Sequence, residues 1–437
     1  MKQLKDYSED IYKCSKCGFC QAVCPVFEET GLETAVSRGK FTLLNGILNN
    51  KVKFGKNIGK YLDMCLGCKA CFDFCPSGIS AEEIIIAARV ENNKLNGISP
   101  FKKAIIWCFK SNTRLKLLGF ALNLYKKTGL IHLTQVLSEF LCGKDGEILR
   151  HSIPWLAAQN DRLGKIISIF NSQLKENIKY SKLTSAKEVS KLKIVYFPGC
   201  IGNHVNFSAK NAVMMALEKN GIKTEIPANL SCCGISSRSA GDIKTFKELA
   251  EKNIKLIPDD TDYLLTDCAS CGSAWDFYPD ILEGELKEKA ERIASKAINI
   301  NKFLAKLNIY IPEGVKLENT VTYHDPCHLA RFQKVTEEPR KILKKIPGVN
   351  YVEMAEADKC CGAAGTFCIV KPEISLLISK RKARNILDTQ ADIIATSCSA
   401  CKIGLTQGLT ELNTKKQVLS PVELLAMLYI QADIHLQ

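Results

Sequence analysis

The placement of cysteine constrains this chain more than any other feature of its sequence. Eighteen of the 21 cysteines fall into four tight groups. Two groups are C-x2-C-x2-C-x3-C-P runs, in residues 14–25 and 65–76. The other two are five-cysteine sets, in residues 200–271 and 327–401, each with an adjacent pair and a C-x2-C pair. Soft thiolate ligands at this density favour iron–sulfur clusters.

The two runs predict a pair of cubane clusters with crossed ligands. Three closely spaced thiolates wrap one cluster, and the fourth cysteine, before proline, binds the other. One [4Fe–4S] cluster would use Cys14, Cys17, Cys20 and Cys75, and the second would use Cys24, Cys65, Cys68 and Cys71. Gly18 and Gly67 should let the backbone approach and donate N–H groups. Zinc also binds C-x2-C pairs, but it takes only four ligands and does not explain two runs with a fourth cysteine before proline.

The five-cysteine sets offer one thiolate more than a cubane needs. The first set is Cys200, Cys232, Cys233, Cys268 and Cys271, and the second is Cys327, Cys360, Cys361, Cys398 and Cys401. The fifth thiolate could bridge two iron atoms in an opened, noncubane cluster. Gly234 and Gly362 follow the adjacent pairs and suit tight packing on a metal centre. A zinc site, a vicinal disulfide and a buried thiol pair stay open as alternatives.

The two sets belong to an internal repeat. Cys200 and Cys327 lie 127 residues apart, and the C-x2-C pairs lie 130 apart. KIVYFPGC and TVTYHDPC read as strands that end at a ligand, and so do DYLLTDCASCG and ADIIATSCSAC. Helical segments such as SAKNAVMMALEKNG lie between them. Alternating strands and helices predict α/β units with mostly parallel sheets and with ligands at the strand ends.

The division expected along the chain has four parts. Residues 1–90 form a mostly helical ferredoxin domain, 91–190 a helical connecting segment, 191–312 the first repeat and 313–437 the second. The fold class is therefore α+β and multidomain. Ser80 and Glu83 should form a capping box at the start of one helix. Ser99 and Pro100 should start another, with proline at its first position.

A basic stretch follows Phe101. It holds Lys102, Lys103, Lys110, Arg114, Lys116, Lys126 and Lys127, with no acidic residue before Ser138 and with apolar residues interleaved. This pattern fits a helix pair that docks on a membrane surface or a partner. A solvated basic face over an ordinary core is the alternative.

Bulk composition excludes several classes of protein. The hydrophobic content of 46% and charged content of 24% are ordinary for globular protein. A disulfide scaffold suits short secreted chains, and the polar start MKQLKDYSEDIYK offers no signal-peptide core, so the expected location is the cytoplasm. No apolar stretch is long enough to span a bilayer. Bound clusters are negatively charged and would offset part of the formal charge of +14. The chain also has no nucleic-acid-binding motif, so binding to nucleic acid is not expected.

The motifs resemble those of a known family. CSKCGFCQAVCPVF with SRGKF, CLGCKACFDFCPSGI, YHDPCHLAR and CCGAAGTF resemble the iron–sulfur subunit of glycolate oxidase. The repeats are similar to the cysteine-rich CCG domains of lactate-utilisation proteins, the small subunit of anaerobic glycerol-3-phosphate dehydrogenase and heterodisulfide reductases. The last of these implies a noncubane [4Fe–4S] cluster at each five-cysteine set. Glycolate-oxidase-like subunits often have an incomplete first set, whereas this chain keeps all five residues.

Several residues near the cysteine groups are further candidates. His324 and His328 flank Cys327 and could donate to cluster sulfurs, relay protons, ligate iron or only fix a loop. They are the candidate catalytic residues, and no catalytic role is assigned. Asp325 and Arg331 are weaker candidates of the same kind.

Two basic residues and three cysteines have less defined roles. Arg38 and Lys40 could offset cluster charge or meet an acidic partner, although a solvated surface is the simpler reading. Cys108, Cys142 and Cys368 fit no group and read as ordinary thiols, with Cys368 the strongest exception.

The chain has no G-x-G-x-x-G and no G-x-x-x-x-G-K-[ST], so neither flavin nor nicotinamide is expected on it. Clusters without a two-electron cofactor imply an FAD-binding partner subunit. The first hypothesis is the electron-transfer subunit of a glycolate- or D-lactate-type oxidoreductase, which passes electrons to quinone or another carrier. Heterodisulfide-reductase-like thiol chemistry and a zinc-bearing structural module are the alternatives. The order of the cluster sites cannot be read from the sequence.

Overall fold

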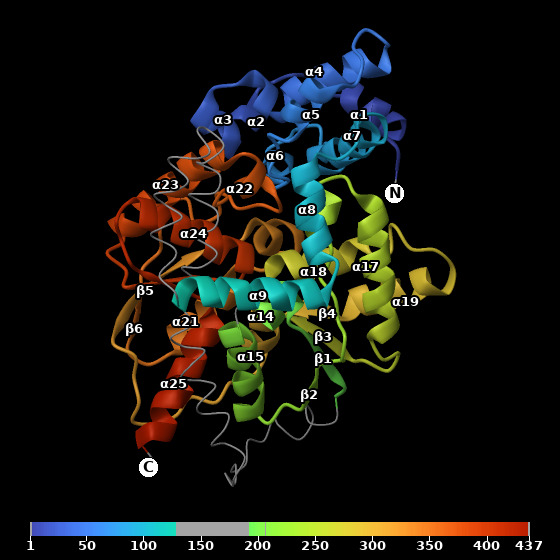
Figure 1. Cartoon of the computed structure of the whole chain (residues 1–437). Helices are drawn as coiled ribbons and strands as arrows, with labels where there is room; N and C mark the ends of the chain where they lie inside the picture. The colour runs from blue at the N-terminus through green and yellow to red at the C-terminus, as the bar shows by residue number, and fades with distance from the viewer. Residues whose placement is uncertain (1, 128–191, 206, 436–437) are drawn as a thin grey trace.

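The computed structural model describes residues 2–127, 192–205 and 207–435 (Figure 1). Cys142 and most of the expected connecting segment therefore lie outside the described residues. The expected fold class is confirmed: a helical N-terminal part is followed by two α/β units with parallel sheets. In Figure 1 the N-terminal part lies at the top, above the first unit in green and yellow and the second in orange and red.

The N-terminal part is built from short helices around one apolar core. The core includes Leu4, Phe41, Leu44, Leu62 and Ile84. The elements are η1 (Leu4–Tyr7), α1 (Ser8–Tyr12), α2 (Phe19–Ala22), α3 (Pro25–Thr30), η2 (Glu33–Ala35), α4 (Ser37–Leu48), α5 (Lys56–Leu62), α6 (Ala70–Asp73) and α7 (Ala81–Asn96). Most of these helices are shorter than two turns, so tertiary packing rather than helix propensity must stabilise them.

Helix α7 begins where the sequence predicts, but its capping contacts differ. Ser80 occupies the N-cap position without a side-chain cap bond, and its hydroxyl donates to the Glu83 carboxylate over 3.0 Å. The start of the helix is therefore as predicted, and the capping box is not formed. Helix α8 (Pro100–Phe109) has the expected start, because Ser99 Oγ accepts from the Lys102 N–H over 3.4 Å. Helix α9 (Asn112–Lys127) follows it.

Each α/β unit contains a four-stranded parallel sheet of the same strand order. The first has the order β2 (Thr224–Glu225), β1 (Ile194–Phe197), β3 (Tyr263–Thr266), β4 (Ala297–Asn299). The second has the order β6 (Val349–Tyr351), β5 (Asn319–His324), β7 (Ile393–Thr396), β8 (Gln417–Leu419). Every ladder is parallel, as expected for strands joined through helices. The identical order shows the internal repeat in three dimensions.

Helices join the strands of both units. The first unit contains α14 (Gly199–His204), α15 (Phe207–Lys219), α16 (Ile235–Ser239), α17 (Ile243–Leu256), α18 (Ala269–Phe277), α19 (Gly284–Lys296) and α20 (Ile300–Ala305). The second contains one π-helical turn, η3 (His328–Phe332), and α21 (Glu337–Lys345), α22 (Phe367–Val370), α23 (Pro372–Asp388), α24 (Ser399–Glu411) and α25 (Pro421–His435). None of the helices in the described residues is long and apolar enough to cross a membrane.

The two units share a core and meet at the ends of their strands. One buried cluster combines Val195 and Leu264 with Ile394 and Leu405. Where β3 and β7 end, the Ala269 N–H donates to the Ser397 carbonyl over 2.9 Å. Asn301 Nδ2 donates to the Ser397 hydroxyl oxygen over 2.9 Å. These bonds hold the two sets of strand ends against each other.

The N-terminal part is fastened to the first unit through α7. Glu82 and Arg238 form an ion pair in which both side chains are buried. Arg89 Nη1 donates to the Ser239 carbonyl over 2.7 Å. A Cβ at Gly241 would lie 2.9 Å from Arg89 Cβ, so a side chain at this position would force the units apart. The packing therefore fixes the relative position of all three parts.

The buried ion pair generates a stability prediction. Removing one partner of such a pair leaves a charge without compensation and costs about 3–5 kcal/mol. We expect Glu82→Gln to lower the urea midpoint of the anaerobically purified full chain. Glu318→Gln, in the exposed pair with Lys316, is the control and should leave the midpoint unchanged. Equal midpoints for the two variants would show that the Glu82 contact does not fasten the units.

Candidate iron–sulfur sites

The first ferredoxin site is a pocket beside helix α2. It is lined by Cys14, Cys17, Cys20 and Cys75, the four residues predicted to share a cluster, and also by Cys71. Gly18 has a φ of +93°, and a Cβ there would lie 2.9 Å from Arg38 Nη1. Glycine is favoured at this position because its φ is positive and because a Cβ would crowd the Arg38 side chain. Cys17 is exposed, so this site lies close to the surface.

The second ferredoxin site is a neighbouring pocket. Cys24, Cys65, Cys68 and Cys71, the second predicted set, all line it. The Gly67 N–H donates to Cys65 Sγ over 3.4 Å, as expected of a glycine beside a cluster. The geometry therefore brings together both crossed sets, Cys75 with the first run and Cys24 with the second. The ligand roles themselves stay predictions.

Lys40 lies near cysteines of the second site and is not on the surface. Its side chain is fully buried, and Nζ donates to the Thr34 carbonyl over 2.8 Å and to the Ala35 carbonyl. Burial lowers the pKa of Lys40, while the nearby thiolates of Cys65 and Cys24 oppose that shift. The solvated-surface reading of Lys40 is therefore wrong.

Arg38 behaves differently from Lys40. Its Nε pairs with a Glu33 carboxylate oxygen over 2.6 Å, and its Nη1 donates to the Lys16 carbonyl over 3.2 Å. The side chain is partly exposed and lines the first ferredoxin pocket. It can therefore offset charge at that site while it also ties α4 to the cysteine loop.

The first five-cysteine set comes together at the ends of β1 and β3. All five thiols are buried. The Cys232 thiol is in hydrogen-bonding contact with Cys200 and Cys233, and the Cys271 thiol with Cys233 and Cys268. A Cβ at Gly199 would lie 2.7 Å from Cys271 Sγ, so glycine leaves room for the sulfur. The set is one connected cluster of sulfur atoms.

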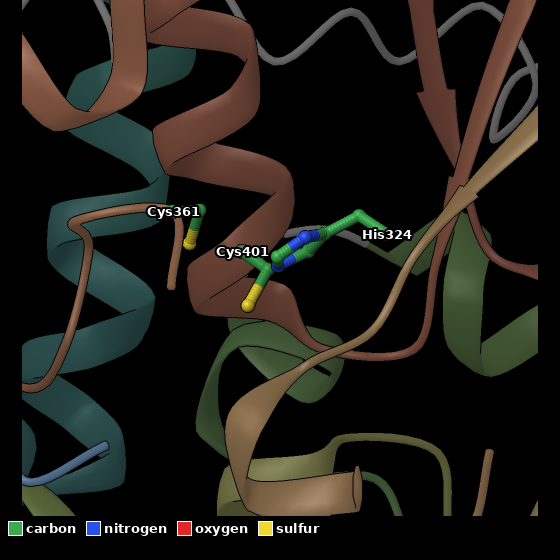
Figure 2. Close-up of side chains that lie close together, drawn as sticks. All are labelled: His324, Cys361 and Cys401. Atoms are coloured by element: carbon green, nitrogen blue, oxygen red, sulfur yellow. The ribbon is translucent and has the colours of Figure 1, made fainter. Parts of the chain in front are cut away.

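The second five-cysteine set repeats this arrangement and adds a histidine. Cys360 contacts Cys327 and Cys361, and Cys401 contacts Cys361 and Cys398. His324, the last residue of β5, has a ring nitrogen within 4.8 Å of the sulfur atoms of Cys361 and Cys401 (Figure 2). Burial lowers the pKa of His324 to about 3.

The four cysteine sites are contiguous, and their order is now visible. Cys71 lines both ferredoxin pockets. Cys24 and Cys68, of the second ferredoxin site, pack against a buried cluster that contains Cys327 and Cys360. Cys398 Sγ lies 3.9 Å from Cys268 Sγ, which joins the second five-cysteine set to the first. The sites therefore follow the order first ferredoxin, second ferredoxin, second repeat, first repeat.

A pocket lies where the three parts of the chain meet. It is lined by Cys65 and Glu82 of the N-terminal part, by Arg238 and Ser270 of the first repeat, and by all five cysteines of the second set, Cys327, Cys360, Cys361, Cys398 and Cys401. His328 also lines it, with its ring stacked on Phe332 at 4.5 Å between centroids. The sulfur atoms of the second set are thus reachable from this pocket.

Two buried cations lie beside the second set. Lys382, on α23, is close to Cys361, and burial lowers its pKa to about 8. Arg331 lies near Cys68 and Cys327 and pairs with Asp358 over 2.8 Å. The sequence singled out Arg331 but missed Lys382, since Lys382 stands more than ten residues from any cysteine. Only its burial on α23 close to Cys361 marks it as a candidate, and that burial can be seen only in the folded structure.

The remaining candidate residues do not line the cysteine pockets. Asp325 pairs with Arg340 over 2.7 Å, which holds the loop before Cys327. Cys108 lies on α8, and Cys368 lies on α22, where burial raises the pKa of its thiol to about 12. Neither cysteine lines a pocket described above.

The donor sets fit iron–sulfur clusters. The thiols of both five-cysteine sets are buried and in hydrogen-bonding contact with one another, and isolated thiolates could not be buried so closely. Soft sulfur donors match iron–sulfur centres, and the ferredoxin pockets each offer four. The residues present are therefore suited to hold clusters at all four sites.

Comparisons with known proteins agree with this chemistry. The family model of the 4Fe-4S dicluster domain matches residues 10–79. The model of the cysteine-rich CCG domain matches residues 194–275 and 321–406. The chain is therefore an iron–sulfur protein with one dicluster domain and two CCG domains, and the resemblance drawn from its motifs is confirmed.

Three relatives illustrate the range of this class. A probable glycolate oxidase iron-sulfur subunit of Bacillus subtilis is 28% identical, over 92% of this chain and 89% of its own length. One subunit of the dihydromethanophenazine:CoB–CoM heterodisulfide reductase of Methanosarcina acetivorans is 28% identical, over 95% of this chain and 93% of its own length. Lactate utilization protein A of Oceanobacillus iheyensis is 28% identical, over 49% of this chain and 88% of its own length. These names support a redox role.

Lys40 generates a prediction about the second ferredoxin site. A buried positive charge stabilises the more negative, reduced state of a nearby cluster. We expect Lys40→Met to lower the reduction potential of one ferredoxin cluster in an EPR-monitored redox titration. Lys56→Met, on the exposed face of α5, should leave all potentials unchanged. Unchanged potentials in both variants would contradict a charge role for Lys40.

Proposed function

We propose that this chain is the iron–sulfur electron-transfer subunit of a flavin-dependent 2-hydroxyacid oxidoreductase of the glycolate or D-lactate type. An FAD-binding partner subunit would carry the hydroxyacid site, and quinone or another carrier would be the acceptor. The contiguous row of four cysteine sites is the observation that carries this proposal. Its similarity to a glycolate oxidase iron-sulfur subunit along nearly the whole chain supports the substrate class.

The residues of the chain would hold, shield and balance the bound clusters. Clusters supply one-electron carriers when bound at such sites. The ten thiols of the CCG sets are buried, so water is excluded there. Lys40 and Lys382 place buried positive charge beside thiolates. Fixed charges and exclusion of water are the means by which a protein tunes cluster potentials.

The first ferredoxin site is the proposed contact with the FAD-binding partner. Cys17 is exposed there, whereas the cysteines of both CCG sets are buried. Phe19, in the same pocket, is 57% exposed, and Phe74 is 55% exposed. Exposed aromatic side chains are enriched at protein interfaces. A partner that covers them would bring its flavin close to the outermost site.

Reconstitution with the partner tests the proposal. The full chain should be purified anaerobically with its co-purifying flavoprotein, and glycolate or D-lactate should then bleach the iron–sulfur absorbance. We expect Cys14→Ser to slow bleaching at least about tenfold, because the first site loses a ligand. Cys108→Ser, outside all four sets, is the control. Hydroxyacid oxidation by this chain without a flavoprotein would contradict the proposal.

Thiol or disulfide chemistry at the CCG sites is a second candidate. Both five-cysteine sets are complete, and they adjoin through Cys268 and Cys398. The pocket at the junction of the three parts gives access to Cys327 and Cys360, with His328 beside them. The relative from Methanosarcina acetivorans, which matches over nearly its full length, belongs to an enzyme named for the reduction of a heterodisulfide.

EPR spectroscopy separates the two candidates. If the second is right, addition of small thiols to the oxidised full chain should change signals of the CCG sites and leave the ferredoxin signals unchanged. Cys360→Ser should abolish the change, because it removes a sulfur that lines the pocket. Spectra that no thiol alters would exclude the disulfide role and leave electron transfer as the function.

Helices α8 and α9 are the proposed site of peripheral contact with an anionic membrane. Phe101, Trp107, Leu117 and Phe120 are between 47% and 68% exposed. Lys103 and Lys116 are exposed beside them. Aromatic and basic side chains on one helical surface favour binding to anionic lipid headgroups. Lys102, which the sequence placed in this stretch, is instead buried and pairs with Asp63 over 2.6 Å.

Liposome sedimentation tests the membrane contact. Each lysine near an anionic surface contributes about 1 kcal/mol, so Lys103→Glu with Lys116→Glu should weaken binding to phosphatidylserine vesicles at least about 30-fold. Lys51→Glu with Lys53→Glu, in the exposed loop after α4, is the matched control. Equal binding by both double variants would contradict a contact through α8 and α9.

A further inference from the structure

The two CCG repeats differ in the three residues before their first cysteine, Phe197-Pro198-Gly199 in one and His324-Asp325-Pro326 in the other. Strand β1 ends at Phe197 and strand β5 ends at His324, and each residue stands three places before the first cysteine of its set. The strands occupy the same place in the two sheets. The repeat therefore puts an aromatic hydrocarbon ring beside one set and an imidazole ring beside the other.

Phe197 has apolar surroundings that explain its presence. Its side chain is fully buried and contacts the Trp275 ring edge to face, with 5.2 Å between centroids. In the second repeat, Leu405 stands where Trp275 stands in the first, four residues after the last cysteine of the set. The second repeat therefore lacks the aromatic partner that Phe197 has in the first.

His324 is a buried polar group whose ring nitrogens make no well-formed hydrogen bond in the described part of the chain. The residue is 0% exposed, and neither ring nitrogen makes a hydrogen bond of good geometry among the described residues. The Ala357 backbone lies nearby and acts to raise the pKa of the ring, but its carbonyl already accepts from the Asp325 N–H over 3.0 Å. Buried polar side chains are rarely left unpaired, because they lose the hydrogen bonds that water gave them. The ring points toward the cysteine set, where its nitrogen and the sulfur atoms of Cys361 and Cys401 all lie within 4.8 Å of one another (Figure 2).

We propose that His324 is an imidazole ligand of the metal centre held by the second CCG set, a donor that the first set lacks. The inference rests on the proposed function, because it requires an iron–sulfur centre at this set. Neutral imidazole is a good ligand for iron, and here it would be a donor added to the five thiolates of the set. The two CCG sites are then chemically different, although their cysteines match one for one.

The set that contains His324 lies inside the row of sites and not at its end. The second set lies between the second ferredoxin site and the first set, since Cys327 and Cys360 share a buried cluster with Cys68 and since Cys398 contacts Cys268. The imidazole nitrogen gives this set a donor that the all-cysteine set beyond it lacks. His324 thus makes the two adjoining CCG sites chemically different.

Pulsed EPR with nitrogen-15 histidine tests the assignment. The full chain is labelled, purified anaerobically and reduced, and the signal of the second set is identified by its loss in Cys327→Ser. We expect a strong nitrogen-15 hyperfine coupling on that signal. His324→Phe, which installs the residue of the first repeat, should abolish the coupling, and His328→Gln should retain it.

His324→Cys is a second variant, which keeps the test valid if His324→Phe fails to fold. His324→Cys offers a thiolate in place of the imidazole, so it should keep the iron content, lose the coupling and lower the reduction potential of that centre. A coupling that is absent from the wild type, as weak as that of a hydrogen-bonded nitrogen, or retained in His324→Phe would overturn the assignment. A chain with iron–sulfur signals but no coupling leaves the proposed function standing, whereas a chain without such signals overturns both.

Discussion

Sulfur atoms held together away from water are the constraint on which this structure depends. Ten thiols of the CCG sets are buried, and Cys268 and Cys398 bring the two sets within 3.9 Å of each other. Neighbouring thiols donate to Cys232 and Cys360, which lowers the pKa of each, while the pKa values of their partners rise. Such a group cannot be fully ionised in a low dielectric without compensation, and metal-bound thiolates provide it. The cross-repeat bonds at Ser397 hold the two sets side by side, and Gly199 leaves room for the sulfur of Cys271.

The positive charges of the chain follow from the same constraint. Lys40, Arg331 and Lys382 are buried beside cysteine sulfurs, and burial of a cation is expensive unless negative charge lies nearby. A cubane with four thiolates carries roughly −2, so several cations are needed inside the molecule. Part of the formal charge of +14 is therefore internal compensation. The exposed remainder on α8 and α9 is the part that can meet an anionic surface.

The sequence predicted the ligand groups, the repeat and the parallel sheets because each depends on local spacing or on the period of apolar residues. Cys14 with Cys75 and Cys24 with Cys65 could be paired from the ferredoxin rule alone. The order of the sites could not be predicted, since it arises where α7 docks on Arg238 and where β3 meets β7. Lys40 and Lys102 were assigned to the surface because lysine usually lies there, and both are buried by contacts with distant segments. His324 was a candidate from its place beside Cys327, but its contrast with Phe197 gains meaning only from the shared strand order of the two sheets.

Four filled sites are the central claim, and metal analysis tests it most directly. Iron, acid-labile sulfide and zinc should be quantified on the anaerobically purified full chain. We predict about 16 iron atoms per chain, because each of the four sites holds a four-iron cluster. About eight iron atoms would confine clusters to the ferredoxin domain, and zinc with little iron would replace redox chemistry by a structural role. Either result would contradict the claim that all four sites hold clusters.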